Sequence, residues 1–266
     1  LYIQKKEGWL GYLRTYEFGD RHKPVVLLLP GTCCHWKNNF FNVIPYLERY
    51  FYVVCISYDG FDENEEATFP TMLEETEKIE SYVKKRFQGH VCCIYGCSLG
   101  GSLVGLLAQR HQISFEHGIL GSSDLDQEKP LHAKISCSIA TLFLYAALQG
   151  KFDMTARLLK KATKSDYLEK MLSFFGIDGD KKDFISKKSI YNQAYSDLIT
   201  SLEDQIEQNG LTVHCFYAQK MGKKYLERYK KHFKNPDIRK HCLKHEELLA
   251  CYPKLWSEEV AGCCGF

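Results

Sequence analysis

The chain has 266 residues and a mass of 30.8 kDa, and 45% of its residues are hydrophobic, which excludes a disordered protein and provides for a large folded core. Thirty-five basic and thirty-three acidic side chains give a formal charge of +2, so the overall charge gives no argument for nucleic acid or an anionic membrane as a partner. No stretch approaches the roughly 18 apolar residues of a membrane span, and the N-terminal LYIQKKEGW lacks the apolar core of a signal peptide. We therefore expect a cytoplasmic protein with no stable membrane insertion and no nucleic-acid partner.

The first part of the chain alternates short apolar runs with helical segments. Strands are predicted at 12–18, 25–29, 52–57, 91–95 and 115–120. Helices are predicted around 39–49 and over 72–87 and 99–109. The second of these has Leu73, Ile79 and Val83 on one side. Buried strands alternating with helices indicate an α/β protein, with a mostly parallel sheet covered on both faces.

The pattern changes between residues 130 and 206, where the periodicity is helical and no convincing strand occurs. Helical periodicity covers 135–148, 154–161, 167–174 and 189–206, with a polar turn at 176–183. Aromatic residues of this segment form either its own core or the wall of a pocket: Phe143, Tyr145, Phe174, Phe175, Tyr191 and Tyr195. Afterwards we predict a strand at 211–217, a basic helix at 223–233, a strand at 237–243 and a final amphipathic helix that begins near His245.

Twelve cysteines are spread through this large chain, and several lie inside apolar runs. This distribution favours buried free thiols in a reducing compartment over a disulfide framework. The adjacent pairs at 33–34, 92–93 and 263–264 lack the spacing of zinc ligands, because neighbouring residues of a strand point to opposite faces. We expect no metal and no cofactor.

The motif with the clearest chemistry is Gly96-Cys97-Ser98-Leu99-Gly100, which has the form G-x-S-x-G. Placed between a buried strand and an apolar helix, this pattern is a nucleophile elbow, in which glycines permit a tight turn and the serine hydroxyl projects outward. The central residue is the one presented, so Ser98 rather than Cys97 is the predicted nucleophile. The competing interpretation is a glycine-rich turn without a function.

A serine nucleophile needs a base, which an imidazole held by a third group supplies. In folds that carry a nucleophile elbow, the catalytic histidine comes after the last strand of the sheet. This order selects His245, with His241 as the second choice. The acid of such sites commonly follows the strand that corresponds to 211–217, but here no carboxylate occurs after this strand before Glu227. Asp124, in GSSDLD after the preceding strand, is our candidate for the acid; Asp126 competes with it, and both could be simple turn residues.

Donors for the developing oxyanion are expected from two backbone amides. One is that of Leu99, directly after the nucleophile, and the other is that of Thr32, in the loop after the 25–29 strand. His35, Trp36 and Asp59 are candidate pocket residues, although packing explains the first two and a turn explains Asp59 equally well. Asp62 follows in the same loop as Asp59 and could also face the site.

Three motifs in this order, LLLPGT (27–32), GCSLGG (96–101) and KHEELL (244–249), resemble the α/β-hydrolase family, and specifically its capped serine esterases and lipases. The resemblance implies an eight-stranded sheet, an acyl-enzyme mechanism and a substrate pocket beneath a cap. It divides the chain into a core of residues 1–129 and 207–266 and a helical cap of residues 130–206 inserted after strand 6. The chain departs from the family in having Pro-Gly where many members have His-Gly, and in lacking the usual acid.

The function expected from these features is hydrolysis of a small-molecule carboxylic ester with an apolar acyl or alcohol group, as in a carboxylesterase or lipase. Thioesterase and acyltransferase chemistry would use the same residues. The alternative is that the protein is not an enzyme of this kind but a ligand-binding homologue with weak or no turnover. The missing acid is the feature that favours this alternative. A serine at position 98 argues against the branches of the fold that use a carboxylate nucleophile.

Overall fold

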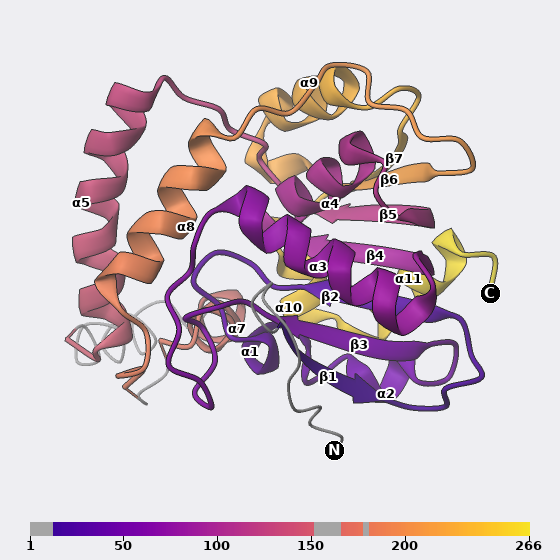
Figure 1. Cartoon of the computed structure of the whole chain (residues 1–266), viewed down its shortest axis with the longest axis horizontal. Coiled ribbons are helices and arrows are strands. Elements are labelled where there is room, and N and C mark those ends of the chain that lie inside the picture. Colours follow the sequence, from indigo (N-terminus) through magenta and orange to yellow (C-terminus); the bar gives the residue numbers. More distant parts are fainter. Residues whose placement is uncertain (1–12, 152–165, 178–180) are drawn as a thin grey trace.

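The computed structural model describes residues 13–151, 166–177 and 181–266, and in this part of the chain seven strands form one sheet in the order β1-β3-β2-β4-β5-β6-β7 (Figure 1). Only β1 runs antiparallel to its neighbour, β3. The strands are β1 (Arg14–Phe18), β2 (Val25–Leu29), β3 (Tyr52–Ser57), β4 (His90–Cys97), β5 (Ser114–Gly121), β6 (Thr212–Ala218) and β7 (Asp237–His241). The predicted α/β class is confirmed. The family resemblance implies eight strands, and seven lie in the described residues; residues 1–12 lie outside this part of the chain.

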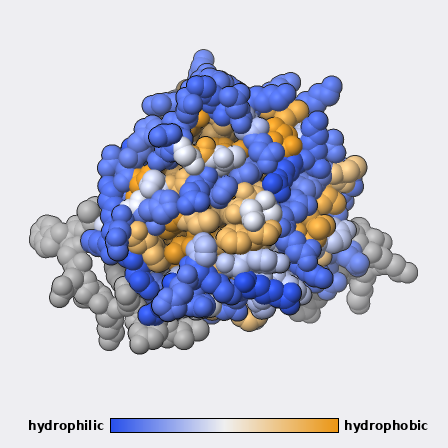
Figure 2. All heavy atoms as spheres, turned by 90° about the vertical axis from the view of Figure 1, so that its right-hand side faces the viewer, coloured by the Kyte–Doolittle hydropathy of each residue, from blue (hydrophilic) through white to orange (hydrophobic). Residues whose placement is uncertain are grey.

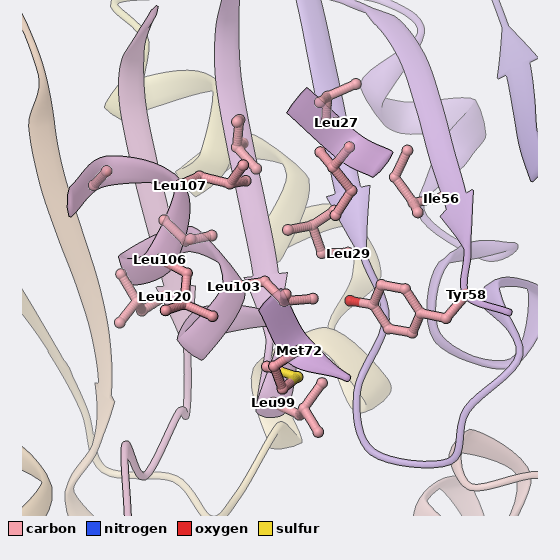
Figure 3. Packing of buried hydrophobic residues seen from close by; sticks show 14 of the residues in the cluster. Leu27, Leu29, Ile56, Tyr58, Met72, Leu99, Leu103, Leu106, Leu107 and Leu120 are labelled. Carbon is pink, nitrogen blue, oxygen red and sulfur yellow. The ribbon is translucent and has the colours of Figure 1, made fainter. Parts of the chain in front are cut away.

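Helices cover both faces of this sheet, so its central strands are buried on both sides. In β2, Leu27 and Leu29 belong to the core on the face of the sheet that α3 (Met72–Phe87), α4 (Leu99–Arg110) and α9 (Lys223–His232) cover. Val26 and Leu28 pack on the other face, which is covered by α1 (Trp36–Phe40), α2 (Ile44–Leu47) and α11 (Pro253–Cys263). Figure 3 shows the first of these cores, with the leucines of α4 against Leu27, Leu29 and Leu120 of the strands.

Two predictions in the first half of the chain need correction. The helix expected around 39–49 is two short helices, α1 and α2, and Pro45 lies in the first turn of α2, where a missing N–H costs nothing. Leu73 is 43% exposed, because the buried side of α3 is formed by Met72, Thr76, Ile79 and Val83 at helical spacing.

Three described helices lie between β5 and β6: α5 (Pro130–Leu148), α7 (Asp166–Phe174) and α8 (Lys187–Ile199). In Figure 1, α5 and α8 lie side by side at one end of the molecule. The helix expected at 154–161 and part of the turn expected at 176–183 lie outside the described residues. The predicted helix 189–206 is wrong in its second half, because α8 ends at Ile199 and the chain returns to the core, where Ile206 forms a bridge with Phe233.

Polar side chains on one side of α8 attach it to the core. Ser189, Gln193 and Ser196 are buried, and each accepts a backbone N–H of the core, those of Phe69, Cys33 and Met72. Asn192 donates to the carbonyl of Phe69 at 2.8 Å. Their spacing of three or four residues places all four on one side of the helix.

The long helix α5 differs from our expectation that no stretch has the length and apolarity of a membrane span. By length and composition alone its 19 residues could cross a membrane, and most of its apolar stretch is not buried inside the protein. Figure 2 shows the opposite end of the molecule, where hydrophobic atoms occupy the middle of the face and hydrophilic residues surround them.

The last part of the chain forms the 3-10 helix Gln219–Met221, then α9 and β7, and finally α10 (Glu247–Cys251) and α11.

Candidate active site

Ser98 lies at the sharp turn between β4 and α4, with φ 47° and ψ −113°. A positive φ is strained for any residue other than glycine, and such strain persists only where the surroundings enforce it. The neighbouring glycines allow the close approach: a Cβ on Gly96 would lie 2.1 Å from the carbonyl oxygen of Gly100, and one on Gly100 would lie 2.5 Å from that of Leu29. The strand, turn and helix of a nucleophile elbow are therefore present.

The hydroxyl of Ser98 is not used to cap the helix that follows it. Ser98 occupies the N-cap position of α4 and makes no side-chain capping bond. Thr71 and Ser186, at the same position of α3 and α8, each accept a backbone N–H of the first helical turn. Since capping is the usual role of a serine in this position, its absence leaves the Ser98 hydroxyl available for chemistry.

The backbone of the elbow is held from two sides. Ser123, which is fully buried, donates its hydroxyl to the carbonyl of Ser98 at 2.6 Å. The N–H of Ser98 points to two acceptors, the carbonyl of Gly121 at 2.9 Å and the carboxylate of Glu246 at 3.0 Å. These bonds maintain the strained backbone while the side chain stays uncommitted.

Glu246 is a residue of this site that our sequence reasoning missed. Its carboxylate is buried and also accepts the hydroxyl of Tyr95 at 3.2 Å, and its own N–H donates to Ser122 at 3.1 Å. Burial raises the pKa of Glu246, while the charge of His245 and the hydrogen bond from the Ser98 N–H act to lower it. In KHEELL this glutamate looks like one of two surface carboxylates at a helix start, and only the fold turns it inward.

His245 lies between β7 and α10, directly before Glu246, so the contact between Glu246 and Ser98 fixes the histidine backbone close to the elbow. The hydroxyl of Tyr167 on α7 donates to the His245 carbonyl at 3.0 Å. Nδ1 of the His245 ring is buried and has no hydrogen-bond partner among the described residues. The other candidate, His241, has its Nε2 3.2 Å from the carboxylate of Glu259 on α11.

Asp124 and Asp126 lie in the loop after β5, and their contacts lead to α9. Arg228 donates to the carbonyl of Asp124 at 2.8 Å and forms an ion pair with the Asp126 carboxylate. Within the described residues neither aspartate is a hydrogen-bond partner of His245 Nδ1, so the role of Asp124 as the acid stays a prediction. Glu246, in contrast, directly follows His245 in the chain and contacts the Ser98 N–H.

The loop after β2 presents the other predicted oxyanion donor. Gly31 contacts the elbow, since a Cβ there would lie 3.6 Å from that of Ser98. The N–H groups of Gly31, Cys33 and Cys34 are occupied by Asn39, Gln193 and the Gly31 carbonyl, respectively. Within the described residues no acceptor takes the N–H of Thr32, and the Leu99 N–H belongs to the first turn of α4, which has no intrahelical acceptors. Tyr58 secures this loop by donating to the Pro30 carbonyl, and Figure 3 shows its hydroxyl directed toward β2.

The three candidate pocket residues are all engaged in packing or ion pairs. His35 caps α1 and has its Nε2 3.7 Å from the buried carboxylate of Asp62. Burial acts to raise the pKa of Asp62, but the neighbouring His35 ring and hydrogen bonds from the Asn64 N–H and the Tyr16 hydroxyl outweigh it, so the pKa is lowered. The ring of Trp36 packs on Tyr16 with the ring centres 4.6 Å apart, and Asp59 pairs with Lys78.

Of the aromatic residues in the insertion, Phe174 is buried in the core, whereas Phe143 is exposed on α5. Tyr191 and Tyr195 stack on each other with ring centres 5.4 Å apart. The structure therefore divides these aromatic residues between packing and the surface.

All twelve cysteines are free thiols. Cys97, next to Ser98, is buried, and burial raises the pKa of its thiol well above the ordinary value, which disfavours the nucleophilic thiolate. No three His, Cys, Asp or Glu side chains converge as a metal site would require within the part of the chain that the structure describes.

Comparison with known proteins agrees with this geometry. The family model described as alpha/beta hydrolase fold matches residues 24–231. Among solved structures, a candidate alpha/beta hydrolase family protein from Desulfitobacterium hafniense is similar with a TM-score of 0.71 and 17% identity, over 93% of this chain and 98% of that one. An esterase from a marine microorganism has a TM-score of 0.68 and 17% identity, over 94% and 98% of the two chains.

A lipase-esterase related protein from Clostridium acetobutylicum has a TM-score of 0.66 and 18% identity, over 95% of this chain and 99% of that one. Sequence identities this low show the fold alone. No curated protein matches the sequence. The match of the family model over most of the chain, with the strained serine between β4 and α4, shows that the protein belongs to the α/β-hydrolase family and supports a hydrolase activity.

Proposed function

We propose that the protein is a serine hydrolase that cleaves a carboxylic ester through an acyl-enzyme intermediate, with Ser98 as nucleophile and His245 as base. The observation that carries the proposal is the strained backbone of Ser98, whose hydroxyl does not cap α4 although it occupies the capping position. A turn with a purely structural role would not need this strain. A nucleophile needs it, because the strained turn presents the serine oxygen to a substrate.

In the proposed reaction, the Ser98 oxygen attacks the ester carbonyl carbon while His245 accepts the hydroxyl proton. The N–H groups of Leu99 and Thr32 bind the resulting oxyanion, and the positive end of the α4 dipole adds to this stabilisation. His245 then returns the proton to the departing alcohol, which leaves Ser98 acylated. Water, deprotonated by His245, attacks the acyl group and releases the carboxylic acid and free Ser98.

The imidazolium formed in both steps needs a negative charge nearby. Asp124 is the carboxylate that the sequence suggests, and Glu246, which directly follows His245 in the chain and contacts the Ser98 N–H, is a second candidate. We propose that Glu246 stabilises the imidazolium through its charge and also holds the nucleophile through the Ser98 N–H. The Ser98 N–H and the Tyr95 hydroxyl both donate to the Glu246 carboxylate, which suits the ionised, acceptor-only form.

The proposal is tested by intact-mass measurement after treatment with a fluorophosphonate, which labels an activated serine whatever its substrate. We expect one adduct on the native protein and none on Ser98→Ala, with Ser102→Ala, a buried serine one turn further along α4, as the matched control that keeps the adduct. A folded native protein without an adduct would contradict the proposal and favour a ligand-binding homologue.

The same assay, followed by turnover of short-chain esters, compares the two carboxylates. We expect Glu246→Gln to reduce kcat about tenfold or more, because the imidazolium that forms in the reaction loses a neighbouring negative charge; a tenfold loss corresponds to about 1.4 kcal/mol of the barrier. A reduction on the order of 10⁴ in Asp124→Asn alone would instead assign Asp124 as the group that orients the imidazole.

A further inference from the structure

The outward face of α5 is an apolar stripe. Its large hydrophobic side chains are between 54% and 68% exposed: Leu131, Ile135, Ile139, Leu142 and Phe143. The first four follow one another at intervals of three or four residues, and Phe143 is next to Leu142. Residues at these intervals lie on one side of a helix. These five make up nearly half of the exposed large hydrophobic residues in the described ranges, so the stripe is a concentration rather than the ordinary scatter of surface hydrophobics.

The inward face of the same helix is built mainly from smaller residues. Ala133, Cys137 and Thr141 are buried at intervals of four, where α5 packs against α8, and Leu148 is the large buried residue near the end of the helix. The arrangement is the reverse of an ordinary surface helix, which buries its large apolar side chains and exposes its small and polar ones. The fold therefore does not need the exposed leucine, isoleucine and phenylalanine side chains for its own packing.

Lysines are more frequent than acidic residues in α5 and the segments next to it. No Asp or Glu occurs within α5, and the two segments 127–151 and 181–199 contain seven lysines, Lys129, Lys134, Lys151, Lys181, Lys182, Lys187 and Lys188. The acids of these segments are Glu128, Asp183 and Asp197. The ammonium group of Lys187 on α8 lies 5.0 Å from the ring centre of Tyr145 on α5, so the basic residues of α8 adjoin this helix.

From these observations we propose that the outward face of α5 docks on an anionic phospholipid surface. The helix lies along the surface, with its apolar side chains among the upper acyl chains and the flanking lysines at the headgroups. Packing of its small-residue face on α8 keeps it within the fold, so it binds the surface without crossing the bilayer. A second copy of the chain is the less suitable occupant, because two such faces would bring lysines against lysines. Docking does not depend on the chemistry of Ser98.

The near-neutral total charge does not oppose this binding. Electrostatic attraction to a membrane is screened within about 10 Å at 0.1 M salt, so the lysines close to the docked face matter more than the carboxylates elsewhere on the molecule. The net charge of +2 is the sum over the whole chain, so it does not reveal the local excess of lysines in and next to α5.

Flotation with vesicles tests the proposal on the full chain. We expect binding to phosphatidylcholine vesicles containing about one-third phosphatidylserine, weak binding to pure phosphatidylcholine, and a decrease as salt rises. The double variant Leu142→Ser, Phe143→Ser should bind at least about tenfold less, because burial of two large apolar side chains is lost. Lys134→Glu should also weaken binding several-fold.

Leu255→Ser on α11 is the matched control, because this leucine is similarly exposed but lies on another helix. It should bind like the native protein, and thermal melts identify any variant that has lost its fold. The proposal is overturned if the native protein does not float with anionic vesicles, if it floats equally with neutral ones, or if the α5 variants bind as well as Leu255→Ser. Dimers that dissociate in the α5 variants, without vesicle binding, would assign the stripe to a second copy instead.

Discussion

Helices α5 and α8 are neighbours in the insertion, yet they present opposite chemistry to the core and to solvent. On α8, the buried positions include Ser189, Gln193 and Ser196, which bind backbone groups of the core. On α5, the large apolar residues face outward and small ones face α8. The difference shows that the type of side chain buried depends on what each helix packs against: α8 meets backbone N–H groups that need acceptors, whereas α5 packs mainly on α8 and reaches the hydrophobic core near its C-terminal end through Leu148.

This contrast also concerns the candidate site. Gln193 binds the N–H of Cys33, directly after Thr32, so α8 helps to set the position of the proposed oxyanion donor. α5 makes no such contact with the elbow or with the loop after β2 among the described hydrogen bonds. α8 therefore contacts the loop that carries the proposed oxyanion donor, whereas the apolar face of α5 is exposed to solvent.

Removal of the Gln193 hydrogen bond should have the largest effect. We expect Gln193→Leu to lower the free energy of unfolding by about 1–3 kcal/mol, because the buried N–H of Cys33 loses its acceptor while the volume is kept. Urea denaturation measures the loss, with the exposed Gln112→Leu as control. An unchanged stability would show that α8 is not held by its buried polar side chains.

Asp197 on α8 should produce a smaller effect that depends on pH. Its carboxyl lies beside a small cavity with Ser102 and Asp126, and burial together with the charge of Asp124 raises its pKa to about 8. This value lies above the ordinary one, so the folded state retains a proton that the unfolded state has lost. The stabilising contribution is therefore complete below about pH 4 and is lost as pH rises toward 8.

Asp197→Asn removes this dependence. We expect its Tm to exceed that of the native protein by about 2–4 °C at pH 9, corresponding to about 1 kcal/mol, and the excess to shrink toward pH 5. The control is Asp204→Asn, which changes an exposed carboxylate. A Tm difference that stays constant over this range would contradict the assigned pKa.

The smallest effect is expected on the outward face of α5. Leu142→Ser with Phe143→Ser should change the free energy of unfolding by no more than about 0.5 kcal/mol, because neither side chain is packed in the fold. Ala133→Leu, on the inward face, should cost about 1–3 kcal/mol through overpacking against α8. Equal losses on the two faces would mean that the outward side chains do contribute to packing.

Much of the core could be predicted from local patterns. The strands 25–29 and 52–57 and the helix 72–87 agree with the predicted bounds, because continuous apolar runs and a capped amphipathic segment identify such elements without knowledge of their partners. The helix predicted over 189–206 failed after Ile199, because Leu202 and Ile206 continue an apolar pattern but are buried by the core and not by a helix face. Periodicity cannot distinguish these two ways of burying the same residues.

By itself, the sequence determined the α/β architecture and the serine turn, since apolar runs, glycine spacing and helix signals are local properties of the chain. The tertiary structure decided which polar residues lie inside. It brought Glu246 onto the N–H of Ser98, directed Asp124 and Asp126 toward Arg228, and buried the polar side of α8 while exposing the apolar side of α5. The physical reason is that the position of a carboxylate, an amide or an apolar stripe depends on the groups it meets, and those groups come from distant parts of the chain.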